Sequence, residues 1–360
     1  MDISSFFSAT YAEAREKFLT ACKARSLDIQ SHLNPNSKGQ QGEDLYMDVV
    51  RIGSDTASKF LVISSATHGG EGFCGSGIQV GLLQEGMLNN LPSDTAVLLV
   101  HAINPYGFSH VRRVNEDNID LNRNFIDFSI PRPDNAPYRE VHDWILPKDW
   151  EGPTKDVADA AIAKYIEDKG MPTFQAAVTA GQHIAEDGVF FGGKKASWSN
   201  DTIRSVIKEH AGDAQHLALL DIHTGLGPYG HGELIYVGAK SGFNRAMNWY
   251  DGEVTDPSAG TSTSAEVFGT MEQGISQMSP NATHTSVAIE YGTIELMEVL
   301  NALRADNWLY IHGDVDTPLG QNIKATVRNA FYCDADDWKA MIWERGHTTI
   351  SKALAGLANS

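Results

Sequence analysis

The segment HGGE, from His68 to Glu71, places two potential metal ligands three positions apart in the glycine-rich stretch 64–77. Catalytic zinc takes three protein ligands and keeps one position open for water, and two histidines with one glutamate are a known set. Gly69 and Gly70 can adopt backbone conformations that are closed to other residues, so a single turn could supply both ligands. A surface turn explains the same segment equally well, so a metal site needs further support.

A possible third ligand lies in the segment DIH, from Asp221 to His223, at the end of an apolar run. Residues two apart on a strand point to the same face of the sheet, so the Asp221 carboxylate could orient the His223 ring for metal binding. Taken alone, the segment is better explained as a satisfied pair of polar groups in the core.

A candidate general base follows a different apolar run. Glu290 comes directly after SVAI, residues 286–289, and before the sequence YGT. A zinc site needs a base to take a proton from its water, and burial can raise the pKa of a carboxyl group towards neutral pH. On its own, this glutamate could also be a simple charge at a strand end.

Arginines are concentrated in the stretch 110–125, where Arg112, Arg113 and Arg123 lie among several asparagines. Arginine can bind a carboxylate through two parallel hydrogen bonds, or polarise a carbonyl group as its oxygen gains charge. The alternative is ion pairing with the acidic residues of the same stretch, which are Glu116, Asp117 and Asp120.

The pattern of apolar residues predicts the elements that carry these candidates. Strands are expected at 45–49, 60–66, 95–103, 216–223, 232–238 and 285–293. Helices are expected from residue 10 onwards and at 75–88, 156–168, 172–186, 294–309 and 336–356. This alternation predicts an α/β fold with a largely parallel sheet and helices on its faces. Ligands bind at the carboxyl ends of strands in such sheets, so the candidate residues should converge there.

One domain spanning residues 1–360 is the simplest organisation, because sheet-forming runs extend over the whole chain and no repeat or low-complexity segment interrupts them. Residues 126–155 are rich in Pro, Asp and Trp and are predicted to form a long surface insertion. Residues 250–284 contain many small polar side chains and are predicted to form a second insertion, a loop over the site.

The composition restricts the possible partners and compartments. The 360 residues include 46 acidic and 28 basic side chains, giving a formal charge of -18, which disfavours nucleic acid or an anionic membrane as a partner. Three scattered cysteines indicate no disulfide framework, and the N-terminus lacks the features of a signal peptide. We expect a cytoplasmic protein that neither spans nor binds a membrane.

Taken in chain order, the motifs HxxE, NPxG, RxN followed by DLNRNF, DxHTG and ExGT resemble those of the zinc carboxypeptidase superfamily. This superfamily contains the carboxypeptidase A-like enzymes and the related aspartoacylase and succinylglutamate desuccinylase enzymes. The segments HGGEGFCGSGIQ, FFGGKKASWSN, DIHTGLGPYGHGELI and IEYGT resemble a bacterial subgroup of carboxypeptidase-like proteins. The resemblance extends over nearly the whole chain.

The resemblance implies a three-layer α/β/α fold with a mixed, largely parallel central sheet, and one zinc ion per chain as the cofactor. Residue by residue, it implies that His68, Glu71 and His223 are the zinc ligands. It also implies that Glu290 is the base that activates the zinc-bound water.

For substrate binding, the resemblance implies that Arg113 polarises the scissile carbonyl group. Asn122 and Arg123, in the segment NRNF, would hold the carboxylate of the leaving amino acid.

The function that we expect is a zinc-dependent hydrolase that cleaves an amide bond next to a free carboxylate. Such an enzyme would be a metallocarboxypeptidase acting on peptides or a deacylase acting on N-acyl amino acids. A zinc esterase or amidase on substrates without a free carboxylate is the alternative within enzymes. The other alternative is a metal-dependent binding protein without hydrolytic activity, and the presence of Glu290 beside a full ligand set argues against it.

Overall fold

The computed structural model describes residues 2–360, and its centre is one mixed sheet of eight strands in the order β1-β2-β4-β3-β5-β8-β6-β7. The strands are β1 (Ile29–Lys38), β2 (Asp44–Gly53), β3 (Lys59–Ser64), β4 (Thr95–His101), β5 (His216–Tyr229), β6 (Gly232–Tyr236), β7 (Val254–Thr255) and β8 (Thr283–Gly292). The four central strands β4, β3, β5 and β8 are mutually parallel, whereas the β1–β2, β2–β4 and β6–β8 pairs are antiparallel. The predicted mixed, largely parallel sheet is confirmed.

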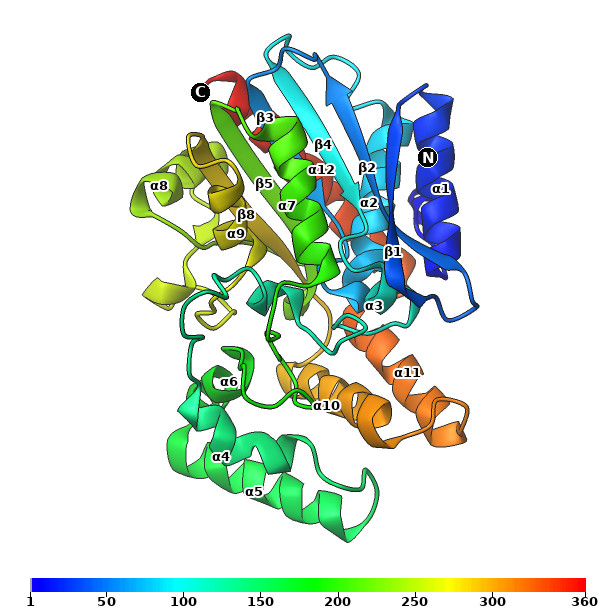
Figure 1. Cartoon of the computed structure of the whole chain (residues 1–360), viewed down its shortest axis with the longest axis vertical. Helices are drawn as coiled ribbons and strands as arrows, with labels where there is room; N and C mark the ends of the chain where they lie inside the picture. The colour runs from blue at the N-terminus through cyan, green and yellow to red at the C-terminus, as the bar shows by residue number, and fades with distance from the viewer. Residues whose placement is uncertain (1) are drawn as a thin grey trace.

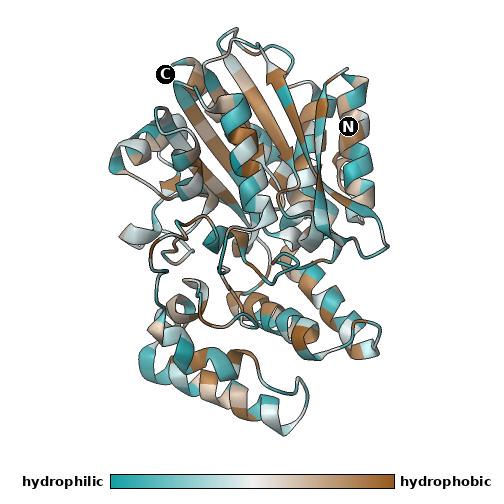
Figure 2. Cartoon of the chain, in the orientation of Figure 1, coloured by the Kyte–Doolittle hydropathy of each residue, from teal (hydrophilic) through white to brown (hydrophobic). Residues whose placement is uncertain are grey.

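The central strands are apolar on both faces because each face packs against its own hydrophobic core. In β3, Leu61 and Ile63 point into one core, while Phe60 and Val62 point into the other. Figure 2 shows the result as long brown, hydrophobic stretches in the central strands.

Helices cover both faces of the sheet and give the predicted three layers (Figure 1). The larger core packs under α1 (Tyr11–Ala24), α2 (Gly72–Glu85), α8 (Lys240–Trp249) and α12 (Asp336–Ala358). The opposite core packs under α7 (Trp198–Ala211) and α9 (Met271–Met278). The side chains of His223 and Glu290 lie on this second face, because they alternate along their strands with residues of the larger core such as Ile222 and Ile289.

A further group of helices lies beyond the carboxyl ends of the central strands, in the lower half of Figure 1. It comprises α4 (Ala136–Ile145), α5 (Pro153–Lys169), α6 (Met171–Thr179), α10 (Leu296–His312) and α11 (Pro318–Phe331), which share a third hydrophobic cluster. The short helix α3 (Pro105–Ser109) follows β4.

The insertion at 126–155 is more structured than the sequence analysis predicted. It contains α4, which begins after Asn135, whose side chain accepts a hydrogen bond from the Tyr138 backbone. Tyr138, Val141 and Ile145 are buried and are spaced as one helical face, so the apolar signal is present but sparse among Pro, Asp and Trp residues.

The segment 250–284, which was predicted as a loop over the site, is also more structured than predicted, because it contains β7 and α9. Thr270 and Gln273 form a reciprocal capping box at the start of α9. The sequence also gave no sign of β1, an edge strand whose Pro35 and flanking polar residues are typical of a turn. Among residues 2–360, no helix is both long enough and apolar enough to cross a membrane.

Candidate metal centre

His68 and Glu71 lie in a 3-10 turn between β3 and α2, and the two glycines between them have different roles. A side chain on Gly69 would place its Cβ atom 2.0 Å from the backbone carbon of Gly107, whereas a Cβ atom on Gly70 would meet nothing closer than 3.8 Å. Neither glycine has a positive φ. Gly69 is therefore required for close backbone packing, and the expectation of a special backbone conformation at this turn was wrong.

Three side chains converge in front of this turn. The Nδ1 atom of His223 lies 3.1 Å from Nδ1 of His68 and 3.0 Å from Oε2 of Glu71, and His68 Nδ1 lies 3.0 Å from Glu71 Oε1. All three side chains are at least 95% buried. The structure thus brings together the three residues that the sequence analysis selected as metal ligands.

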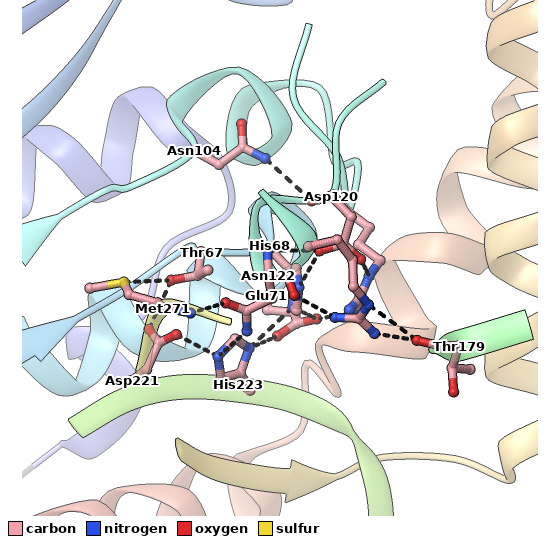
Figure 3. Close-up of polar contacts among 12 residues, drawn as sticks. Thr67, His68, Glu71, Asn104, Asp120, Asn122, Thr179, Asp221, His223 and Met271 are labelled. Atoms are coloured by element: carbon pink, nitrogen blue, oxygen red, sulfur yellow. Dashed lines mark hydrogen bonds and ion pairs between the residues drawn. The ribbon is translucent and has the colours of Figure 1, made fainter. Parts of the chain in front are cut away.

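Each imidazole ring is held from behind by a carboxylate, as Figure 3 shows. His68 Nε2 lies 3.1 Å from Asp120 Oδ1, and His223 Nε2 lies 2.6 Å from Asp221 Oδ2. The other oxygen of Asp221 accepts hydrogen bonds from Ser64 and Thr67, so this carboxylate is itself fixed. Histidines that ligate metals are oriented by such carboxylate partners.

The donor set fits a divalent cation such as zinc. A carboxylate can only accept a hydrogen bond, so the Nε2 atom of each ring carries the proton and each Nδ1 atom is left with a free lone pair. Two lone pairs and the Glu71 carboxylate therefore point at one place, where only a positive charge is stable. Although burial acts against it, the carboxylates of Asp221 and Glu71 hold the pKa of His223 well above its usual value. A proton can occupy this place in the metal-free chain, and a metal ion would replace it.

A second group of potential ligands, Asp221, His223 and Glu272, lies directly behind the first. The Nε2 atom of His223 already donates its proton to Asp221 there, so the ring has no lone pair to offer on that side. This group therefore suits a cation less well than the first.

Glu290 lies beside the metal ligands because β5 and β8 are adjacent parallel strands, and Glu290 on β8 is paired in register with His223 on β5. Its Oε1 atom accepts a hydrogen bond of 2.9 Å from the Leu226 backbone, and the side chain is half-buried. Burial, together with the negative charge of Glu71, raises the pKa of Glu290 to about 7. The carboxyl group can thus both take up and release a proton near neutral pH.

Arg113 donates hydrogen bonds both to the metal ligand Glu71 and to Asp120, the carboxylate behind His68. Its Nε atom donates to Asp120 Oδ2 at 2.8 Å and its Nη1 atom donates to Glu71 Oε1 at 3.3 Å. Its Nη2 atom makes no hydrogen bond within residues 2–360 and is free to donate into the cavity. Arg112, by contrast, points away and pairs with Asp306 on α10. The ion-pairing alternative for the arginine-rich stretch therefore holds only for Arg113 with Asp120.

Asn122 and Arg123 complete the site. Asn122 accepts a hydrogen bond from the Met271 backbone, and its amide nitrogen lies 3.4 Å from His223 Nε2. Arg123 donates only to backbone carbonyls, those of Thr179 and Asn122, and forms no ion pair with any described residue. Burial, despite the attraction of Asp120, lowers the pKa of Arg123 to about 10. Its guanidinium group is a buried cation that lacks a carboxylate partner.

One cavity of about 110 Å³, which we call the catalytic cavity, is lined by His68, Arg113, Asn122, Arg123, His223 and Glu290, whereas Glu71, Asp120 and Asp221 lie behind its wall. Its opposite wall is apolar and consists of Leu296, Val299, Leu300 and Leu303 from α10 with Phe331 and Phe190. Phe190 stacks against Arg113 and Arg123, with ring-to-guanidinium distances of 4.9 and 5.5 Å. Phe190 also has a φ of 53°, which is rare for a bulky residue.

Residues 7–345 match the family described as "Protein of unknown function (DUF2817)". The chain belongs to this family. A comparison with curated proteins found no match.

Several solved structures are similar to the chain at low identity. The structure of bovine thrombin-activatable fibrinolysis inhibitor in complex with tick carboxypeptidase inhibitor is 10% identical, with a TM-score of 0.49, and the match covers 98% of this chain and 97% of that one. Carboxypeptidase A from Helicoverpa armigera is 16% identical, with a TM-score of 0.46 and coverages of 89% and 74%. Murein-tripeptide amidase MpaA from Escherichia coli O157 is 12% identical, with a TM-score of 0.34 and coverages of 81% and 91%. Carboxypeptidases also form the superfamily that the motifs resemble, but similarities at this level assign no function.

Sequence reasoning missed three residues of this DUF2817 site. Asp120 appeared only as a possible ion-pair partner of arginine, although it stands two positions before Asn122 and caps the turn that carries it. Glu272 lies in the segment that was predicted as a loop. Phe190 begins the segment FFGGKKASWSN, but no role was assigned to it, because its importance comes from contacts between distant segments.

Proposed function

We propose that this chain is a zinc-dependent hydrolase that cleaves an amide bond adjacent to a free carboxylate. The observation that carries the proposal is the convergence of His68, Glu71 and His223 beside Glu290, whose pKa is about 7. When bound, the zinc ion would acidify a water molecule and polarise the substrate carbonyl group.

The proposed proton transfers belong to Glu290. In its carboxylate form it takes a proton from the attacking water, and it then gives this proton to the nitrogen of the leaving amine as the amide bond breaks. A pKa near the working pH suits both steps, because the same group must act first as a base and then as an acid.

Arg113 is proposed to stabilise the carbonyl oxygen as this oxygen gains negative charge. Its bonds to Asp120 and Glu71 fix the plane of the guanidinium group, and the side chain lines the cavity with its Nη2 atom not bonded to the protein. A donor that is already oriented costs no reorganisation when the charge develops.

Arg123 and Asn122 are proposed to bind the free carboxylate of the substrate. Arg123 lines the cavity as a buried cation without an acidic partner, and a substrate carboxylate would supply that partner. This feature favours a metallocarboxypeptidase or N-acyl amino acid deacylase over an esterase or amidase on uncharged substrates.

The experiment that tests this function combines metal analysis with assay. The purified protein should bind one zinc ion per chain, and it should release free amino acids from a library of dipeptides and N-acyl amino acids. Chelation should abolish this activity and zinc should restore it. Bound zinc without turnover of any substrate in the library would support a binding protein and overturn the proposal.

A further inference from the structure

A second cavity, of about 480 Å³, lies between α9, the start of α8 and the outer part of β8. Val237 and Glu272 line both this cavity and the catalytic cavity. The two spaces are therefore neighbours that share a wall. The second one is much larger than the catalytic cavity, at about 110 Å³, and none of the roles assigned above uses it.

Three residues that line the second cavity have polar atoms that are buried and lack a hydrogen-bond partner. These atoms are Glu272 Oε1, Ser286 Oγ and His284 Nδ1. Glu272 and Ser286 are only 5% and 4% exposed. An unpaired buried polar atom is costly, so each of these atoms calls for a partner that the chain itself does not supply.

The three unpaired atoms share one chemical property, which is that they can accept hydrogen bonds. Glu272 offers a carboxylate oxygen and Ser286 a hydroxyl group. The Nε2 atom of His284 lies 2.8 Å from the carbonyl oxygen of Ser279, which can only accept, so His284 carries its proton on Nε2 and presents Nδ1 as an acceptor. The ligand that fits this set must therefore supply several donors.

The side of the cavity at Glu272 favours a cation. Glu272 lies next to a second buried carboxylate, Asp221, with ligand atoms no more than 4.8 Å apart. Arg245 also lines the cavity, but its three nitrogens donate to Thr285 Oγ1 and to the carbonyl oxygens of Ser241 and His284. Arg245 is thus held by neutral groups and makes no ion pair with Glu272, whose Oε1 atom stays without a hydrogen-bond partner.

The geometry of β8 connects this cavity to the reaction centre. His284, Ser286, Ala288 and Glu290 alternate with buried apolar residues and so lie on one face of the strand. His284 and Ser286 line the second cavity, while Ala288 and Glu290 line the catalytic cavity. A side chain that leaves the reaction centre along this face would meet Glu272 first and then Ser286 and His284.

We propose that the second cavity receives the side chain of the leaving amino acid and that this side chain ends in an ammonium or guanidinium group. This inference rests on the proposed function and names its substrate class. The terminal N–H groups would bond to Glu272, Ser286 and His284, while Arg123 holds the α-carboxylate.

The first test compares substrates that differ only in this terminal group. N-acetyl-lysine and N-acetyl-norleucine have the same four-carbon side chain with and without the amine. We expect kcat/KM for the lysine substrate to be roughly 10- to 100-fold higher, because the uncharged analogue leaves the buried acceptors unpaired. Equal values, or a preference for norleucine, would overturn the inference while leaving a hydrolase in place.

The second test is the E272Q variant, which keeps the volume of the side chain and removes its charge. The ratio of kcat/KM for lysine over norleucine should fall at least tenfold, roughly the contribution of one charge-assisted hydrogen bond. An equal loss on both substrates would mean that Glu272 only supports Asp221 and His223, and would overturn the inference.

E266Q is the matched control, because Glu266 is exposed and lies in the same segment. S286A serves as an independent variant, with a smaller fall in the same ratio.

Binding to the metal-free protein separates this inference from the proposed function. In titration calorimetry after chelation, free lysine should bind at least about tenfold more tightly than norleucine, and E272Q should remove the difference. If this preference appears but no substrate is hydrolysed, the binding site stands and the proposed function fails. If both amino acids bind equally, the site fails whatever the activity.

Discussion

His223 and Glu290 are partners in the register of two adjacent parallel strands, β5 and β8, and their side chains lie on the same face of the sheet. A proposed metal ligand and a proposed general base are thereby fixed to each other by backbone hydrogen bonds. Sites built on strands hold their geometry more precisely than sites on loops.

Removing the carboxylate behind His223 should weaken zinc binding without removing a ligand. In the wild type, the charged Asp221 carboxylate accepts the Nε2 proton of His223. In D221N a neutral amide replaces this carboxylate, so the ring becomes less basic and less well oriented. We expect zinc affinity to fall by about 10- to 100-fold, measured by competition with a chelator.

An H68A variant that kept full zinc occupancy would contradict the ligand assignment itself.

The two glycines of the HGGE turn should differ sharply when replaced by alanine. G69A forces a Cβ atom into the Gly107 backbone, whereas G70A has free space. We expect G69A to lower the free energy of unfolding by about 2–3 kcal/mol and to reduce zinc binding, while G70A stays close to the wild type. Thermal and urea denaturation of the pair provide the measurement. Similar destabilisation of both variants would indicate that backbone freedom, not packing, is what the turn requires.

The sheet was predictable from the sequence because its central strands are buried on both faces and appear as continuous apolar runs. The edge strand β1 was not, because its stability comes from pairing with β2 and not from its own polar residues. The same division holds at the site. His68, Glu71, His223 and Glu290 stand at strand ends in recognisable motifs, whereas Phe190 and Glu272 reach the cavity only through tertiary packing.

Glu290 should be needed for turnover and not for metal binding. E290Q keeps the side-chain volume and removes the ability to take up a proton. We expect kcat to fall by about 10²- to 10⁴-fold, the usual contribution of a general base, with unchanged zinc content. Activity assays and metal analysis on the same preparation provide the check. Loss of zinc in parallel with activity would instead place Glu290 among the ligands.

The pH dependence of kcat/KM should report on the same carboxyl group. The raised pKa of Glu290, about 7 in the metal-free chain, means that the base form is lost as the pH falls through this value. A bound divalent cation stabilises the carboxylate, so the acidic limb should lie at or below pH 7, with a slope of one. Rates measured from pH 5 to 9 with constant zinc occupancy test this. A profile that rises towards low pH would exclude a carboxylate base.

Arg123 should contribute to recognition of the substrate carboxylate and to little else. R123A removes the buried guanidinium, so kcat/KM for an N-acyl amino acid should fall by roughly 10- to 100-fold, mainly through KM. R123K should recover only part of this loss, because an ammonium group cannot form two parallel hydrogen bonds to a carboxylate. The corresponding amide-blocked substrate should have a low kcat/KM with the wild type, and this value should change little in the variants.

R132Q, at an exposed arginine, is the control for charge alone. If the blocked and free substrates lost activity equally in R123A, Arg123 would have a structural role and the substrate carboxylate would bind elsewhere.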